Sequence, residues 1–203
     1  MLVLGAHPDD IEIGGGGTIL RLLAARPELE VRWEVFSGAG ERRSEAEASA
    51  AAFLGGSARA AVVVHGFRDG FVPHQPAIKE RFVTIRSAFV PDLILTHQRD
   101  DRHQDHRVLA ELTWNTFRRH LVLEYEIPKY DGELAPPNLF VPLTGAIVDR
   151  KVELLMRHFG SQQSRSWFTA DTFRALARLR GVESAAPDGF AEGFLSRKAT
   201  LAL

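Results

Sequence analysis

Short apolar segments alternate with amphipathic or alanine-rich segments as far as Arg119. Each apolar segment ends in glycine, proline or charged residues, which is typical of a buried strand. The apolar segments predict strands at Leu2–Ala6, Val31–Phe36, Ala61–His65 and Leu93–Thr96. The segments between them predict helices at Thr18–Ala25, Arg43–Leu54, Pro76–Val90 and Val108–Arg119. Because strands and helices alternate, we expect an α/β fold with a Rossmann-like, doubly wound, mainly parallel sheet and helices on both faces.

The alternation changes after residue 120. Leu121–Ile127 and Leu139–Leu143 predict two short strands, which we expect to form a small added pair at one edge of the sheet, within residues 121–143. Val148–Phe159 and Thr172–Arg180 predict helices, and residues 181–203 carry no clear pattern. No repeat or linker marks a boundary, so the length of 203 residues predicts one domain spanning residues 1–203.

The composition is typical of a globular protein and argues against several functional classes. Hydrophobic residues make up 45% of the chain, enough for a core that needs no disulfide or structural metal. Lys and Arg total 25 and Asp and Glu total 26, a balance that argues against a nucleic-acid or anionic-membrane binder. No segment approaches the roughly 18 apolar residues of a membrane helix. Met1–Ala6 lacks the basic region of a signal peptide, so we expect a cytoplasmic protein without membrane insertion.

The chain has no cysteine, so a metal site would have to be built from His, Asp and Glu. Two clusters of these residues directly follow predicted strands: His7–Asp10 after the first and Asp100–His106 after the fourth. The carboxyl ends of parallel strands lie at one edge of a sheet, so we expect the two clusters to meet there.

The spacing within each cluster suits a metal ion. His7 and Asp10 are three residues apart, as are His103 and His106, which lets two side chains of a turn point the same way. A site of two imidazoles and a carboxylate suits a catalytic zinc, and Asp9 beside it would take a proton from water. One His-Asp pair alone is more often a capped helix start, so the hypothesis depends on both clusters meeting.

Residues 6–17 read Ala-His-Pro-Asp-Asp-Ile-Glu-Ile-Gly-Gly-Gly-Gly. This segment resembles the signature of the PIG-L/LmbE-like family of zinc-dependent N-deacetylases. That family carries a second motif, His-x-Asp-His, further along the chain, and His103–His106 matches it. Weaker matches, including Arg43–Glu45 and Ser161–Gln162, extend the resemblance over residues 2–195.

The resemblance implies a role for each motif residue. The ligands of one zinc ion per chain would be His7, Asp10 and His106, and the general base would be Asp9. His103 would stabilise the oxyanion or protonate the leaving amine, with Asp105 holding it. Amide hydrolysis needs an activated water, a Lewis acid on the carbonyl and a proton donor, and this set supplies all three. Asp105 would raise the pKa of the His103 imidazole and favour its charged form.

Three further residues are expected to contact substrate: Arg43, Asp69 and Asp101. Asp69 follows the third strand at the same edge of the sheet and could reach a hydroxyl group. Arg43, like Arg42, suits a sugar or phosphate group, although charges at an exposed helix start are as often solvated. His97 ends the fourth strand and is either an outer partner of the site or structural. The segment Tyr125–Asp131 matches no known specificity.

The leading functional hypothesis is a zinc-dependent hydrolase that removes acetyl from an N-acetylglucosamine-type sugar in a small glycoside or nucleotide sugar. Fe(II), Co(II) or Mn(II) would also fit the ligands. A metal-dependent phosphoesterase would usually need more ligands, to hold two metals. A non-catalytic sugar- or nucleotide-binding module would hold phosphate at Gly14–Gly17, but these glycines lack the Gly-x-Gly-x-x-Gly order of such sites. The resemblance also suggests a homo-oligomer.

Overall fold

The computed structural model describes residues 1–132 and 134–200. Its strands are β1 Leu2–Gly5, β2 Val31–Ser37, β3 Ala60–Phe67, β4 Leu93–His97, β5 Leu121–Tyr125, β6 Leu139–Leu143 and β7 Phe190–Leu195. Its helices are α1 Asp10–Ala25, α2 Glu41–Leu54, α3 Ala77–Ala88, α4 Gln104–Thr116, α5 Gly145–His158 and α6 Ala170–Glu183. Two short 3-10 helices, η1 Val72–His74 and η2 Gly160–Gln162, complete the described elements.

The strands form one sheet in the order β3-β2-β1-β4-β5-β7-β6. The pairs from β3 to β5 are all parallel, and β7 runs antiparallel to both β5 and β6. The expected doubly wound, mainly parallel sheet is therefore confirmed. The chain winds outward from β1 in one direction through β2 and β3, and in the other direction through β4 and β5.

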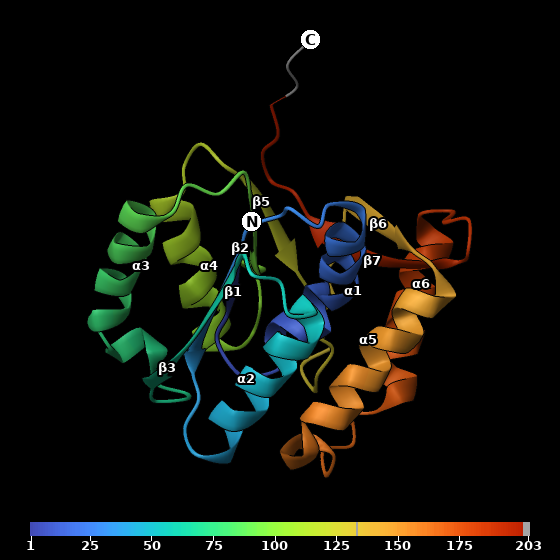
Figure 1. The fold of residues 1–203 in the computed structure, drawn as a ribbon, viewed down its shortest axis with the longest axis horizontal. Coiled ribbons are helices and arrows are strands. Elements are labelled where there is room, and N and C mark those ends of the chain that lie inside the picture. Colours follow the sequence, from blue (N-terminus) through green and yellow to red (C-terminus); the bar gives the residue numbers. More distant parts are fainter. Residues whose placement is uncertain (133, 201–203) are drawn as a thin grey trace.

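Helices cover both faces of the sheet. Helices α3 and α4 pack on one face, and α1, α2 and α5 pack on the other (Figure 1). Residues along β1 alternate between the two cores: Leu2 and Leu4 belong to the α3/α4 core, whereas Val3 belongs to the core beneath α1, α2 and α5. This alternation is what a strand buried on both faces produces.

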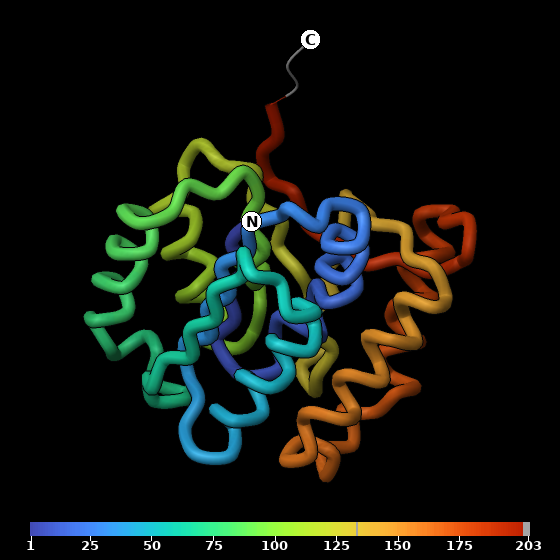
Figure 2. Tube along the Cα trace, in the orientation of Figure 1, coloured from blue at the N-terminus to red at the C-terminus, as the bar shows by residue number. Residues whose placement is uncertain are grey.

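The expected added strand pair differs from the observed one. Strand β5 is a parallel strand that continues the sheet beside β4, and it does not pair with β6. Instead β7 lies between them, and the C-terminal part of the chain returns to the body of the sheet to reach this place (Figure 2). The antiparallel pair at the edge is therefore β6–β7. The partner of β6 was not predicted because Phe190–Leu195 lies in the stretch without a clear pattern.

Helix α1 begins eight residues before its predicted start at Thr18, so the four glycines lie inside the helix. They are needed for close packing. A Cβ atom at Gly14 would lie 2.2 Å from Tyr125 Cδ2, and one at Gly16 would lie 2.7 Å from Phe53 Cε1. Glycine thus lets α1 approach β5 and α2 more closely than any other residue would allow.

The loops that follow β1 and β4 are neighbours because these two strands pair at the point where the winding direction reverses. In open α/β sheets, ligands bind at the carboxyl ends of the strands next to such a point. Helix α4 begins at Gln104 rather than at the predicted Val108, so Asp105 and His106 lie in its first turn. Within the described residues, no helix has both the length and the apolar character required to cross a membrane.

Candidate metal centre

Two consecutive aspartates follow β1 and face different partners. Asp9 has a backbone φ of 99°, a left-handed conformation that costs a non-glycine residue about 1–3 kcal/mol. Asp10 begins α1, where the helix N-terminus stabilises a carboxylate, and its Oδ2 accepts the His7 backbone N–H at 2.6 Å. The Asp9 carboxylate lies 3.3 Å from Arg42. The Asp10 carboxylate faces His7 and His106 instead.

The loop after β4 and the first turn of α4 supply the second group of side chains. His103 is the N-cap of α4, and its Nδ1 accepts the backbone N–H of Asp105 at 3.3 Å. The Nδ1 of His106 lies 2.9 Å from Asp101 Oδ2. Helix α4 therefore brings both imidazoles to the edge where the β1 loop lies.

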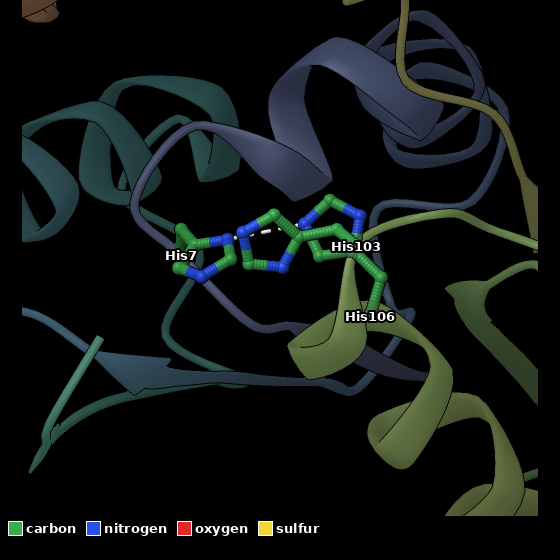
Figure 3. A group of neighbouring side chains, drawn as sticks. All are labelled: His7, His103 and His106. Carbon is green, nitrogen blue, oxygen red and sulfur yellow. Dashed lines mark hydrogen bonds between the residues drawn. The ribbon is translucent and has the colours of Figure 1, made fainter. Parts of the chain in front are cut away.

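Three potential ligand atoms converge between these two groups. His7 Nδ1 lies 3.1 Å from His106 Nε2, a contact drawn as a dashed line in Figure 3. His7 Nδ1 lies 3.3 Å from Asp10 Oδ2, and His106 Nε2 lies 3.5 Å from Asp10 Oδ1. Zinc–ligand bonds of about 2.0–2.2 Å in a tetrahedron separate the ligand atoms by about 3.3–3.6 Å, so the three side chains have nearly the spacing that a zinc ion needs.

The hydrogen bonds behind the two imidazoles decide which nitrogens carry protons. His7 Nε2 lies 3.2 Å from Asp105 and 3.1 Å from Asp69, and His106 Nδ1 lies against Asp101. Ionised carboxylates only accept hydrogen bonds, so each of these outer nitrogens must donate. In the neutral imidazoles, the inner nitrogens then carry lone pairs that face each other and Asp10. Converging lone pairs repel one another unless a cation lies between them, and this arrangement fits a metal ion.

The charges around the site shift the pKa values of its members in opposite directions. Burial alone would lower the pKa of His7, but the charge of Asp10 and hydrogen bonds to three carboxylates raise it well above its ordinary value. Burial and the neighbouring His97 lower the pKa of His106 to about 3. Burial opposes ionisation of Asp10, yet the surrounding histidines hold its pKa well below the usual range. A site with two neutral imidazoles and one carboxylate is thus favoured once a cation replaces the proton on His7.

Asp9 is the member of the cluster best suited to exchange protons. Burial raises its pKa to about 7, although the positive charge of Arg42 acts in the opposite direction. A carboxylate that titrates near neutral pH can both accept and release a proton during a reaction. Arg42 is held in turn by Glu45, 3.5 Å away, and donates to the Pro8 carbonyl.

The motif residues thus form one cluster, and the chain matches the GlcNAc-PI de-N-acetylase family, PIG-L, over residues 2–117. This chain belongs to the PIG-L family.

Three solved structures share the fold of this PIG-L family member. TT1542 from Thermus thermophilus has 22% identity and a TM-score of 0.77, covering 100% of this chain and 96% of its own. The 4-carboxy-2-hydroxymuconate hydratase GalB from Pseudomonas putida KT2440 has 18% identity and a TM-score of 0.80, covering 100% and 97%. The N,N'-diacetylchitobiose deacetylase from Pyrococcus horikoshii has 20% identity and a TM-score of 0.70, covering 95% and 81%. Because a hydratase and a deacetylase share this fold, the fold alone does not decide the reaction.

The structure changes the expected link between His103 and Asp105. The Asp105 carboxylate contacts His7 and accepts the backbone N–H groups of Gly70 and Val72, whereas only its backbone N–H reaches His103. Burial, with the charge of His7, lowers the pKa of His103, against the raising effect of Asp105. The lowered pKa favours the neutral form of the His103 ring over the charged imidazole expected from the sequence, and the contact at Nδ1 leaves the ring proton on Nε2.

The three residues expected to contact substrate lie in different surroundings. Asp101 is 1% exposed, and its carboxylate contacts His106, Lys129 and a backbone N–H. It is therefore too buried to contact a substrate, and it holds the outer nitrogen of His106 instead. Asp69 is 75% exposed in its side chain and contacts His7, which places it at the rim. Arg43 donates to the Val64 carbonyl and pairs with Glu47. Its neighbour Arg42, and not Arg43, contacts Asp9.

The structure places His97 beside the cluster, as one of its two expected roles required, and adds Lys129, which the sequence analysis did not single out. His97 Nε2 lies 3.1 Å from Asp10 Oδ2, and Lys129 contacts Asp101. Lys129 follows a strand whose carboxyl end lies at this edge, and this is the signal that could have identified it. The sequence analysis did not predict Lys129 at the site because it placed β5 in an edge pair rather than in the parallel part of the sheet.

Proposed function

We propose that this chain is a metal-dependent amide hydrolase that removes the acetyl group from an N-acetylated sugar of the N-acetylglucosamine type. The observation that carries the proposal is the convergence of His7 Nδ1, His106 Nε2 and the Asp10 carboxylate beside an aspartate poised to exchange protons. Membership of a family described as GlcNAc-PI de-N-acetylases supports the acetylated amino sugar as substrate class.

We propose zinc as the metal, at one ion per chain. Zinc accepts both imidazole nitrogen and carboxylate oxygen, and a site with three protein ligands leaves a position for water, as catalytic zinc sites do. When bound, the ion would polarise the amide carbonyl and acidify a water molecule. Fe(II), Co(II) and Mn(II) suit the same ligands, so metal analysis has to cover all four.

Asp9 would act as the general base. Its carboxylate would take one proton from the attacking water as the water oxygen forms a bond to the amide carbon. When the carbon–nitrogen bond breaks, the same proton would pass to the sugar nitrogen, giving a free amine and acetic acid, which then releases the second water proton to solvent as acetate forms. The Arg42 contact keeps the Asp9 carboxylate in place and limits how far burial raises its pKa.

His103 would stabilise the negative charge that develops on the carbonyl oxygen. Its Nδ1 accepts a hydrogen bond from the Asp105 backbone, so the proton of the neutral ring lies on Nε2 and is free to be donated. The ring centroid lies 4.7 Å from those of His7 and His106, which places this donor next to the potential ligands (Figure 3). A fixed donor aimed at a developing charge contributes about 2.7–4 kcal/mol of transition-state stabilisation.

A metal analysis combined with an activity assay tests the proposal. Purified protein should contain about one zinc ion per chain, and it should release acetate from a small N-acetylglucosaminide in a reaction that a chelator abolishes and zinc restores. Asp9→Asn should retain the metal but lose activity by roughly 100-fold or more, since the amide cannot accept a proton.

Other outcomes would contradict the proposal in distinct ways. Two metal ions per chain with phosphatase activity would favour a phosphoesterase. Metal binding without acetate release from any N-acetylated sugar would reject the substrate class, and sugar binding by a protein without metal would favour a binding module. Full activity of Asp9→Asn would reject the assigned base.

A further inference from the structure

We infer that Lys129 is a positioning residue of the metal site, acting on His106 through Asp101; this inference rests on the proposed function. The Lys129 ammonium lies 3.0 Å from Asp101 Oδ1 and 3.1 Å from Asp101 Oδ2. Asp101 Oδ2 lies 2.9 Å from His106 Nδ1, and the other nitrogen of that ring faces His7 and Asp10. A continuous chain of contacts therefore joins the loop after β5 to a potential metal ligand.

Asp101 needs a cationic partner because of its burial. Its side chain is 1% exposed, and a buried carboxylate without a partner is strongly unfavourable. His106 donates one hydrogen bond to it and the His103 backbone donates another at 2.7 Å, but both donors are neutral when a metal is bound. Lys129, whose side chain is 11% exposed, brings a positive charge to both oxygens of this carboxylate.

The parallel pairing of β4 and β5 brings Lys129 next to Asp101. Strand β5 pairs in parallel with β4, so the segments that follow the two strands leave the sheet at the same edge. The segment after β4 carries Asp101, and the segment after β5 carries Lys129. Lys129 directly follows Pro128, and the proline ring fixes the backbone φ of residue 128. The ammonium thus joins two loops that the sheet has already brought together, and it fixes the carboxylate that orients His106.

Orientation of the ligand ring is the property that Lys129 supports. An imidazole that binds a metal is held by the partner of its outer nitrogen, and loss of such a partner typically costs about 10–100-fold in metal affinity. Without Lys129, the buried Asp101 carboxylate would lose the positive charge that offsets its burial, and it would hold the ring of His106 less firmly.

Metal affinity tests the inference without reference to substrate. Zinc and cobalt affinities of the full chain should be measured by competition with a chelator, together with the cobalt absorption spectrum of the bound site. We expect Lys129→Met to bind both metals about 10-fold more weakly. Lys129→Arg should recover most of the affinity, because it keeps the charge and the donors. Lys79→Met, in an exposed position on α3, is the matched control and should bind like the unchanged protein.

A double-mutant cycle shows whether Lys129 acts through Asp101. The Lys129→Met effect should largely disappear in an Asp101→Asn background, because residues that act as one unit are not additive. Unchanged affinity and an unchanged cobalt spectrum in Lys129→Met would overturn the inference, and so would equal effects in both backgrounds. If affinity depends on Lys129 but the protein releases no acetate from any amide, the proposed function fails while the positioning role stands.

Discussion

His7 presents its two ring nitrogens to different kinds of partner. Nδ1 faces Asp10 and His106 across the space suited to a cation, and Nε2 faces two carboxylates, those of Asp105 and Asp69. The two carboxylates differ in surroundings, since the Asp105 side chain is fully buried and the Asp69 side chain is 75% exposed. A buried acceptor is screened far less by water, so Asp105 should hold the ring more strongly.

This difference predicts unequal effects of two matched substitutions. Asp105→Asn should weaken zinc affinity about 10-fold or more, because it weakens the acceptor that fixes His7. Asp69→Asn should change the affinity little, since its contact is exposed and Asp105 remains. Chelator competition on both variants measures the two affinities, and thermal unfolding of the metal-free proteins checks that both fold. A larger loss in Asp69→Asn would show that the exposed carboxylate, not the buried one, orients His7.

Sequence reasoning at this scale identified which residues meet but not which atoms face each other. The sequence correctly predicted that His7, His103 and His106 lie in one cluster, because both motifs directly follow strands and the strand order places those strand ends side by side. The predicted contact between the Asp105 carboxylate and His103 was wrong. Asp105 is the second residue of α4, and its carboxylate accepts the Gly70 backbone N–H in the loop after β3, whereas only its backbone N–H reaches the cap residue His103. The direction of a side chain in the first turn depends on where the helix starts, and the start of α4 was predicted at Val108 rather than at Gln104.

Helix α1 carries Asp10 at its first residue, so the packing of this helix determines where the carboxylate lies. Gly14 is the position of closest approach, because a Cβ atom there would lie 2.2 Å from Tyr125 Cδ2 and 2.5 Å from Tyr125 Cγ. Gly15 is less restricted, with Leu95 Cδ1 at 3.1 Å as the nearest atom. Substitution by alanine changes helix propensity equally at Gly14 and Gly15 but creates a severe overlap only at Gly14, so the pair distinguishes the effect of packing from that of helix propensity.

Gly14→Ala and Gly15→Ala should have different effects on stability. Alanine improves intrinsic helix stability by about 1 kcal/mol at either position. At Gly14 the overlap with the Tyr125 ring should outweigh this gain and lower the free energy of unfolding by about 1–3 kcal/mol. At Gly15 a small shift of the Leu95 methyl group should leave stability nearly unchanged. Urea unfolding of the metal-free variants measures both; equal stability of the two would show that the approach of α1 to β5 is not limiting.

Elements whose local preference agrees with the tertiary structure were predicted, and those that depend on distant partners were not. The alanine-rich segment before Gly55 forms α2 close to its expected range. The N-terminal half of α1 was missed because four consecutive glycines disfavour a helix, and close packing against residues far away in sequence, such as Tyr125 and Phe53, makes them favourable. Strand β7 was missed for the same reason, since its place between β5 and β6 is determined by pairing.

The candidate metal site lies at the carboxyl ends of β1 and β4, and a second group of buried charges lies on the neighbouring strand β2. The doubly wound order was predictable because it follows from the alternation of elements over the chain, and it located the site at the carboxyl edge near β1 and β4. On β2, the strand next to β1, Glu34 is fully buried and lies at the centre of a charge cluster. Its carboxylate contacts Arg32 at 2.7 Å, His65 at 2.6 Å and Arg81 at 3.1 Å, which links β2, β3 and α3.

This charge cluster predicts how stability depends on acid. Burial alone would raise the pKa of Glu34, but His65, Arg32 and Arg81 lower it below its ordinary value of 4.5. A carboxyl group whose pKa is lower in the folded state stabilises the fold fully above its unfolded pKa, and this contribution is lost as pH falls through the folded pKa. The metal-free protein should therefore lose stability below about pH 4.5.

Comparison with a variant isolates the part of this loss that belongs to Glu34. Glu34→Gln should be less stable than the unchanged chain at pH 7, and the difference should shrink toward low pH, where Glu34 itself becomes protonated. Glu47→Gln is the matched control, because the Glu47 side chain is 52% exposed and its pair with Arg43 should contribute little at either pH. Urea unfolding between pH 7 and pH 3 measures the three curves. A constant difference between Glu34→Gln and the unchanged chain would mean that the ionised form of Glu34 does not support the packing of α3 on the sheet.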